Sequence, residues 1–120
     1  MKSLVASLAL VFVFGCATTS TSNRDRVDEA LRARKGEFYE CFKREVRAGT
    51  KLSSGKIDIQ FYIKKNGRAA KASILNSTIY NANVENCVLA LVLSTQFATH
   101  KDNAFKVIYP FSYKTPRDKE

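Results

Sequence analysis

The stretch KIDIQFYIKKNGRAAKASIL, residues 56–75, decides the fold that the sequence predicts. Polar and apolar residues alternate along its first half, which is typical of a strand with one buried face. The residues on that face are Ile57, Ile59, Phe61 and Ile63. The dipeptide Asn66-Gly67 follows, and it predicts a type I′ hairpin turn with positive φ at both positions. We therefore expect a hairpin. Its return strand, over residues 68–75, has three residues on the buried face: Ala70, Ala72 and Ile74.

Apolar residues recur at helical spacing on both sides of this hairpin. Residues 24–48 predict a helix that Gly36 interrupts and Gly49 ends. Its apolar stripe comprises Val27, Leu31, Phe38, Cys41, Phe42 and Val46. Residues 81–97 predict a second helix, with Asn83 as its N-cap. The stripe of that helix comprises Val84, Cys87, Val88, Leu91 and Val92.

A third strand is predicted at residues 104–114, where alternation returns. Phe105, Val107, Tyr109, Phe111 and Tyr113 share one face of it. The order helix, strand, strand, helix, strand predicts a small α+β domain over residues 24–114, followed by a polar tail at 115–120. A right-handed crossover gives a three-stranded mixed or antiparallel sheet in the order 2-1-3, with both helices on one face. Pro110 agrees with an edge position for the third strand, since proline is tolerated at sheet edges.

The first residues of the chain predict export. Lys2 precedes a short apolar run, which is too short to cross a bilayer and fits a signal peptide at 1–15. Val13-Phe14-Gly15-Cys16 resembles the lipobox of bacterial lipoproteins, in which the cysteine receives acyl chains such as palmitate. Residues 16–23 would then be a polar tether. Ala17 after the cysteine favours the periplasmic side of the outer membrane. The alternatives are an ordinary signal peptide or an N-terminal anchor helix.

Cys41 and Cys87 each lie on the apolar stripe of a predicted helix. If the two helices pack side by side on the sheet, the two sulfurs can meet. An oxidising periplasm then favours a disulfide. The alternative is two buried free thiols that pack as small apolar groups.

Several of these segments together resemble the AgmX/PglI C-terminal domain family, named from gliding-motility proteins and related to the C-terminal domain of TonB. The matching segments are FYECF around Cys41, GKIDIQFYIKKNGRAAKASILNST, VENCVLALVLSTQF and FKVIYPFSY. The family pattern falls on Gly55, Gly67, Ser77, Cys87-Val88 and Tyr109-Pro110-Phe111, within residues 37–114. The resemblance implies a TonB-like α+β fold and a protein-binding role.

Motifs for chemistry are absent from the sequence. There is one histidine, His100, in a polar stretch that suggests a solvated loop, and no CxxC pair, so we expect no catalytic residues, metal or cofactor. We also expect no small-molecule substrate.

The net charge is +9. A candidate basic patch comprises Arg32, Lys35, Lys43, Arg47, Lys64, Lys65 and Arg68. An exported protein is not expected to meet nucleic acid. A solubilising surface is the simplest interpretation of these charges, and attraction to anionic lipid is the other.

The sequence therefore predicts a non-enzymatic envelope lipoprotein, held at the membrane by its lipid anchor, that binds a protein partner. An extended segment of that partner would add to the free edge of the third strand. The residues expected to flank the added strand are Lys106, Ile108, Pro110 and Ser112. The alternative is a structural lipoprotein whose basic surface contacts lipopolysaccharide, anionic lipid or cell wall.

Overall fold

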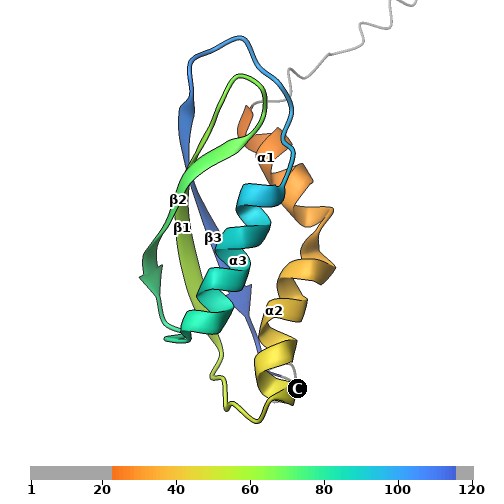
Figure 1. The fold of residues 1–120 in the computed structure, drawn as a ribbon, viewed down its shortest axis with the longest axis vertical. Coiled ribbons are helices and arrows are strands. Elements are labelled where there is room, and N and C mark those ends of the chain that lie inside the picture. The colour runs from red at the N-terminus through yellow and green to blue at the C-terminus, as the bar shows by residue number, and fades with distance from the viewer. Residues whose placement is uncertain (1–22, 116–120) are drawn as a thin grey trace, which may run out of the picture.

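The computed structural model describes residues 23–115 and confirms the α+β class (Figure 1). The elements are α1 (Asn23–Arg32), α2 (Lys35–Arg47), β1 (Gly55–Ile63), β2 (Ala69–Ser77), α3 (Ala82–Ser94) and β3 (Phe105–Tyr113). The predicted signal peptide, the tether with Cys16, and the tail beyond Thr115 lie outside the described residues.

The three strands form one sheet in the order β2-β1-β3, as predicted. Both outer strands are antiparallel to β1. The helices lie on one face of this sheet, with α3 beside β2 and against α2 (Figure 1). β3 is therefore an edge strand, and α2 packs beside it.

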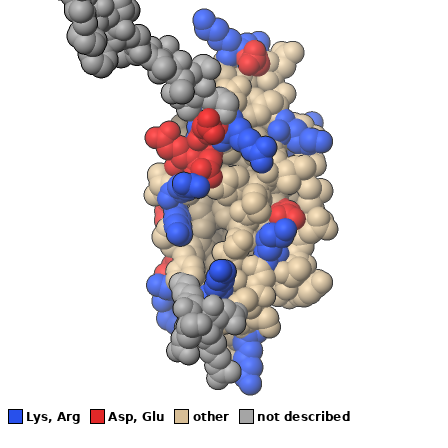
Figure 2. Space-filling model, turned by 180° about the vertical axis from the view of Figure 1, so that it is seen from behind, with Lys and Arg blue, Asp and Glu red and all other residues tan. Residues whose placement is uncertain are grey.

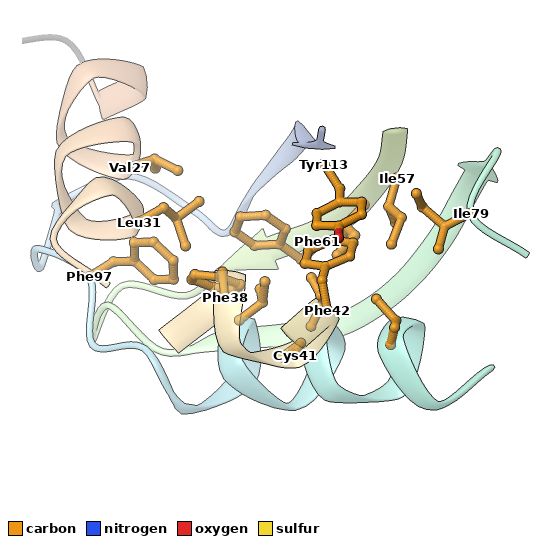
Figure 3. Close-up of a cluster of buried hydrophobic side chains, with 14 of the residues drawn as sticks. Val27, Leu31, Phe38, Cys41, Phe42, Ile57, Phe61, Ile79, Phe97 and Tyr113 are labelled. Carbon is orange, nitrogen blue, oxygen red and sulfur yellow. The ribbon is translucent and has the colours of Figure 1, made fainter. Parts of the chain in front are cut away.

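The core lies between the sheet and the helices (Figure 3). All four apolar residues predicted on β1 are at most 1% exposed. Three valines of α3 are also fully buried: Val84, Val88 and Val92. Burying one such side chain stabilises a fold by about 1.5–3 kcal/mol. These two rows of side chains hold α3 to the centre of the sheet.

The single helix expected before the hairpin is instead two helices, and Gly36 is not the break. Gly36 lies within α2, and the chain leaves the helical path at Ala33 and Arg34. At this bend the side chain of Arg34 reaches the end of α3. Gly49, with φ of +94°, ends α2 as predicted.

The expected type I′ turn is also not formed. Gly67 has a φ of +78°, but Asn66 has no positive φ. The Gly67 amide donates to the Lys64 carbonyl at 2.8 Å, and the Lys64 amide donates to the Arg68 carbonyl at 2.9 Å. This is a longer hairpin loop that needs glycine at one position only.

The return strand differs from the expectation because it is bulged. Lys71 has a φ of +54°, and the register with β1 shifts between Gln60 and Tyr62. Ala70 therefore pairs with Tyr62, on the face away from the helices. The core face of β2 carries Ala69, Ala72 and Ile74.

The N-cap of α3 is Asn81, not Asn83. The Asn81 Oδ1 accepts a hydrogen bond from the Val84 amide at 2.9 Å. Asn83 lies inside the first turn of the helix, where its side chain is exposed. The N-cap therefore lies two residues earlier than predicted.

Candidate functional site

In the part of the chain that the structure describes, the order β2-β1-β3 leaves two free sheet edges, the outer sides of β2 and β3, and the sequence predicted that a partner binds at β3. β3 pairs with β1 along its whole length, from Phe105 opposite Ile63 to Tyr113 opposite Gly55. Within residues 23–115, no strand pairs with its other side. Four residues of β3 are exposed on the open face of the sheet: Lys106, Ile108, Pro110 and Ser112. These are the residues that the sequence predicted for this face.

Pro110 indicates which backbone groups face the free edge. Proline has no N–H, and in sheets it occurs where that missing group does not face a neighbouring strand. Residues two apart on a strand direct their backbone groups to the same side. We infer that the N–H and C=O groups of Ile108 and Ser112 face outward beside Pro110. The edge therefore offers donors on both sides of the proline.

A groove of about 420 Å³ runs between this edge and the two N-terminal helices. Its lining is Leu31, Arg32, Lys35, Phe38, Tyr39, Phe42, Tyr109, Pro110, Phe111 and Ser112. Five of these residues are aromatic, and the two cations come from the end of α1 and the start of α2. A strand added to β3 would turn every second side chain toward this groove.

Stacked rings make the wall of the groove rigid. Phe38 stacks on Phe111 with centroids 4.7 Å apart. Phe42 stacks on Tyr113 at the same centroid distance, with the ring planes 2° apart. Such aromatic pairs contribute about 0.5–1.5 kcal/mol beyond the area they bury. These ring pairs pack α2 directly against β3 at the base of the groove.

Tyr109 ties the middle of β3 to α1. Its hydroxyl donates to Asp28 Oδ1 at 2.6 Å, and Asp28 also pairs with Arg32 at 2.9 Å. Burial raises the pKa of Tyr109 to about 12, and the hydrogen bond to the Asp28 carboxylate adds to the rise. The phenol therefore stays protonated and keeps donating to Asp28 at neutral pH.

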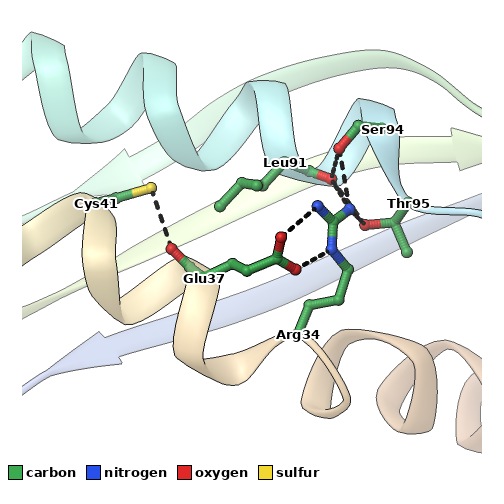
Figure 4. A network of polar contacts seen from close by, with 6 residues as sticks. All are labelled: Arg34, Glu37, Cys41, Leu91, Ser94 and Thr95. Atoms are coloured by element: carbon green, nitrogen blue, oxygen red, sulfur yellow. Dashed lines mark hydrogen bonds and ion pairs between the residues drawn. The ribbon is translucent and has the colours of Figure 1, made fainter.

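Arg34 holds the bend between α1 and α2 against the end of α3 (Figure 4). Its Nη1 donates to the Leu91 carbonyl at 3.1 Å and to the Thr95 hydroxyl at 2.8 Å. Its other nitrogens donate to both carboxylate oxygens of Glu37. The hydrogen bond from Arg34 lowers the pKa of Glu37. This contact fixes the position of Lys35 and Phe38, which follow Arg34 in the groove wall.

The predicted disulfide between Cys41 and Cys87 is confirmed. The two Cα atoms are 5.8 Å apart, and the bond joins α2 to α3. Cys41 is buried and follows Phe38 by one turn, so the disulfide anchors the helix that forms one wall of the groove.

A larger depression, of about 800 Å³, lies between α2 and α3. Its two carboxylates are already engaged, since Glu37 pairs with Arg34 and Glu40 pairs with Arg47. It includes no strand residue, so no backbone edge is available to a partner there. We therefore place the candidate site at the β3 groove and not at the larger depression.

The residues of the predicted basic patch do not form one surface. Lys64, Lys65 and Arg68 belong to the β1–β2 turn, while Arg47 ends α2 and pairs with Glu40. Arg32 and Lys35 border the groove, and Lys43 lies 4.9 Å from the Tyr39 ring centroid. Figure 2 shows basic side chains scattered around a broad uncharged area, with acidic side chains gathered at one side.

His100 is not the solvated loop histidine that the sequence suggested. It is half-buried, and its ring meets Phe105 at 4.8 Å between centroids. Its Nε2 donates to the Ile63 carbonyl at 3.2 Å, because a carbonyl can only accept. The histidine therefore fastens the loop before β3 to the end of β1.

The groove itself was missed by sequence reasoning. The signal available was the aromatic pair Phe38-Tyr39 with Phe42 one turn later, but this spacing also predicts ordinary core packing. In residues 23–115 no group of three or more acidic, cysteine or histidine side chains could hold a metal ion. No helix in that range has the length and apolar character needed to span a membrane.

Comparison with protein-family models, with curated proteins and with solved structures found no match.

Proposed function

We propose that the protein is a non-enzymatic lipoprotein of the bacterial envelope that binds an extended segment of a protein partner. The segment adds as a fourth strand to the free edge of β3. The observation that carries this proposal is the aromatic groove beside an edge strand with no neighbour among the described residues. The resemblance to the AgmX/PglI and TonB C-terminal domains supports a protein-binding role.

The groove also defines the chemistry of the partner segment. Main-chain hydrogen bonds to an edge provide affinity, and pockets for alternate side chains provide specificity. Side chains at every second position would meet Phe38, Tyr39 and Phe111, so they are apolar. Lys35 is exposed at the border and takes part in none of the ion pairs of the described residues. An acidic residue in the segment would pair with it.

Lys106 makes the edge selective. A charged residue on an edge strand opposes pairing with unrelated strands, which protects the protein from aggregation. Pro110 removes one further donor from the middle of the same edge. Contacts in the groove must therefore compensate a partner segment for the charge of Lys106 and for the missing N–H of Pro110.

In-cell photo-crosslinking tests the proposal. A photoreactive residue at Ser112, on β3, should give one discrete protein adduct that mass spectrometry identifies. The same residue at Ser73 is the matched control, because Ser73 is exposed on the opposite edge strand. Ile108→Pro should abolish the Ser112 adduct by removing an outward N–H, whereas Ile108→Thr, which keeps the N–H, should preserve it.

Three results would contradict the proposal. Adducts to lipid alone, or no adduct in a correctly anchored protein, would remove β3 as a binding edge. Equal adducts from Ser112 and Ser73 would mean contact without a specific surface. An adduct only to a second copy of this chain would replace the envelope partner by self-association.

A further inference from the structure

One end of the domain gathers basic residues from three separate segments. Figure 1 shows the start of α1, the β1–β2 turn and the loop before β3 at the same end of the molecule. A small hollow shows that α1 and the loop before β3 meet at the end of β1, since it is lined by Asn23 and Arg26 of α1, Ile63 of β1, and His100 and Phe105. We call this the hairpin end. Its basic residues are Arg24, Arg26, Lys64, Lys65, Arg68 and Lys101.

Hydrogen bonds hold the segments of the hairpin end together. The Phe97 amide donates to the Gly67 carbonyl at 2.9 Å, and the His100 amide donates to the Lys65 carbonyl at 3.1 Å. The Gln96 side chain donates to the Asn66 carbonyl at 2.8 Å. The β1–β2 turn and the loop before β3 therefore present their charges from one fixed surface.

The cations of the hairpin end are exposed and available. All six are exposed. The acidic residues on the same segments are Asp25, Asp28, Glu29 and Asp102, and Asp28 pairs with Arg32. The ion pairs among residues 23–115 involve other cations: Arg32, Arg34, Arg47 and Lys56. The basic residues at the opposite end of the sheet include Arg47 and Lys56, whose charges are already balanced by Glu40 and Asp58.

The length of the tether places this end near a membrane. Cys16, the predicted lipid anchor, precedes Asn23 by seven residues. Seven extended residues span at most about 25 Å. Asn23 begins α1 and lines the hollow of the hairpin end. The lipid anchor belongs to the proposed function, on which the placement of this end rests: with Cys16 acylated, the tether keeps the start of α1, and the hairpin end with it, close to the lipid headgroups.

We propose that the hairpin end docks on the anionic phosphate headgroups of the membrane to which the protein is anchored. This goes beyond the binding of a partner at β3 and uses a different surface. Docking of the hairpin end would also orient the β3 edge relative to the membrane. β3 starts at the hairpin end with Phe105 and runs away from it to Tyr113, so the groove would extend outward from the membrane.

Tryptophan quenching in vesicles tests the docking. The chain contains no tryptophan, so one introduced residue is a specific probe. The mature lipoprotein carries Thr99→Trp at the hairpin end or Ser53→Trp in the loop before β1, both at exposed positions. Vesicles contain brominated phosphatidylcholine, with or without phosphatidylglycerol. We expect phosphatidylglycerol to increase quenching of Thr99→Trp but not of Ser53→Trp, and salt to reverse the increase.

A charge-matched pair of variants supplies the control. Lys65→Gln/Lys101→Gln should lower the ratio of docked to undocked protein roughly 25-fold, about fivefold per lysine near an anionic surface. Lys51→Gln/Lys114→Gln removes the same charge from exposed positions at the other end of the sheet and should change the ratio little. Equal effects of the two pairs of variants, or the same quenching with and without phosphatidylglycerol, would overturn the proposal. A mass spectrum showing unacylated Cys16 would also overturn it and leave partner binding at β3 untouched.

Discussion

The guanidinium of Arg34 donates to the carbonyl of Leu91, which joins the bend between α1 and α2 to the last turn of α3. The same guanidinium reaches the hydroxyls of Ser94 and Thr95. Arg34 and Leu91 are 57 residues apart in sequence, so this one side chain connects distant parts of the chain.

Replacing Arg34 by alanine should lower the free energy of unfolding by about 1–2 kcal/mol. The Leu91 carbonyl and the buried Thr95 hydroxyl would lose a charged donor, and removing one partner from a part-buried hydrogen bond costs about this much. Urea denaturation measures the change. Arg44→Ala is the control, because Arg44 is exposed and takes part in no ion pair among the described residues. If both variants lose the same free energy of unfolding, Arg34 contributes only its positive charge and not its hydrogen bonds to α3.

The disulfide should be a large part of the stability of this domain. Cys41 and Cys87 are 46 residues apart, and a loop of that length stabilises by about 4 kcal/mol in the chain-entropy model. Cys41→Ala/Cys87→Ala should therefore shift the urea midpoint strongly downward. Reducing agent should shift the parent protein in the same direction and leave the double variant unchanged. If reducing agent does not change the urea midpoint of the parent protein, packing alone holds α2 to α3.

The sequence predicts those parts of the fold that depend on the pattern of residues along a single helix or strand. β1 alternates strictly because the sheet buries only one of its faces, so Ile57 to Ile63 identify both the strand and its buried side. Pro110 identifies the edge, since a proline in the central strand would remove a ladder hydrogen bond. The disulfide followed from two cysteines on the apolar stripes of helices that cover the same sheet.

The parts that the sequence does not predict depend on contacts between distant segments. The turn at Gly67 is shaped by Phe97, whose amide bonds to the Gly67 carbonyl. The bend between α1 and α2 lies where Arg34 contacts α3, and the bulge at Lys71 reverses the faces of Ala70 and Ala69. The groove is formed by side chains of α1, α2 and β3 together, so no local pattern could reveal it.

Stability should fall as the pH rises from about 10 toward 12, in part through Tyr109. Its pKa is raised to about 12, mainly by burial, above the ordinary value of 10.0. The folded protein therefore holds this proton more tightly than the unfolded chain. The contribution is complete below pH 10 and is lost as the pH passes through the folded pKa. Burial also raises the pKa of Tyr113, so tyrosinate absorbance in a pH titration should show late ionisation of both tyrosines, and Tyr109→Phe should remove one of the two.

Asp28→Asn separates the causes of the late ionisation of Tyr109. The amide can still accept the hydrogen bond from Tyr109, but the negative charge that opposes ionisation is gone. The ionisation of Tyr109 should then move to lower pH but stay above the ordinary tyrosine value, because burial is the larger cause. If Asp28→Asn leaves this ionisation where it was, the contact between α1 and β3 does not form in solution.

Two glycines should respond to alanine in opposite directions. Gly67 has a φ of +78°, and a Cβ there would lie 2.1 Å from the Phe97 carbonyl oxygen and 2.6 Å from Gln96 Nε2. Gly67→Ala combines backbone strain with a clash against backbone, so we expect a loss of about 2–3 kcal/mol. Gly36 is inside α2, and a Cβ there meets nothing within 4 Å. Gly36→Ala should therefore stabilise by about 0.5–1 kcal/mol, since alanine is the better helix former.

Urea midpoints of the two variants check this pair directly. The opposite signs matter because a general effect of adding a methyl group would move both midpoints the same way. Gly67→Ala should also weaken the hairpin end, since the Phe97 amide bonds to the Gly67 carbonyl. Faster exchange of the Phe97 and His100 amides than in the parent protein would demonstrate it. If those amides stay protected while the midpoint falls, the strain is confined to the turn, and the hairpin end keeps its arrangement without Gly67.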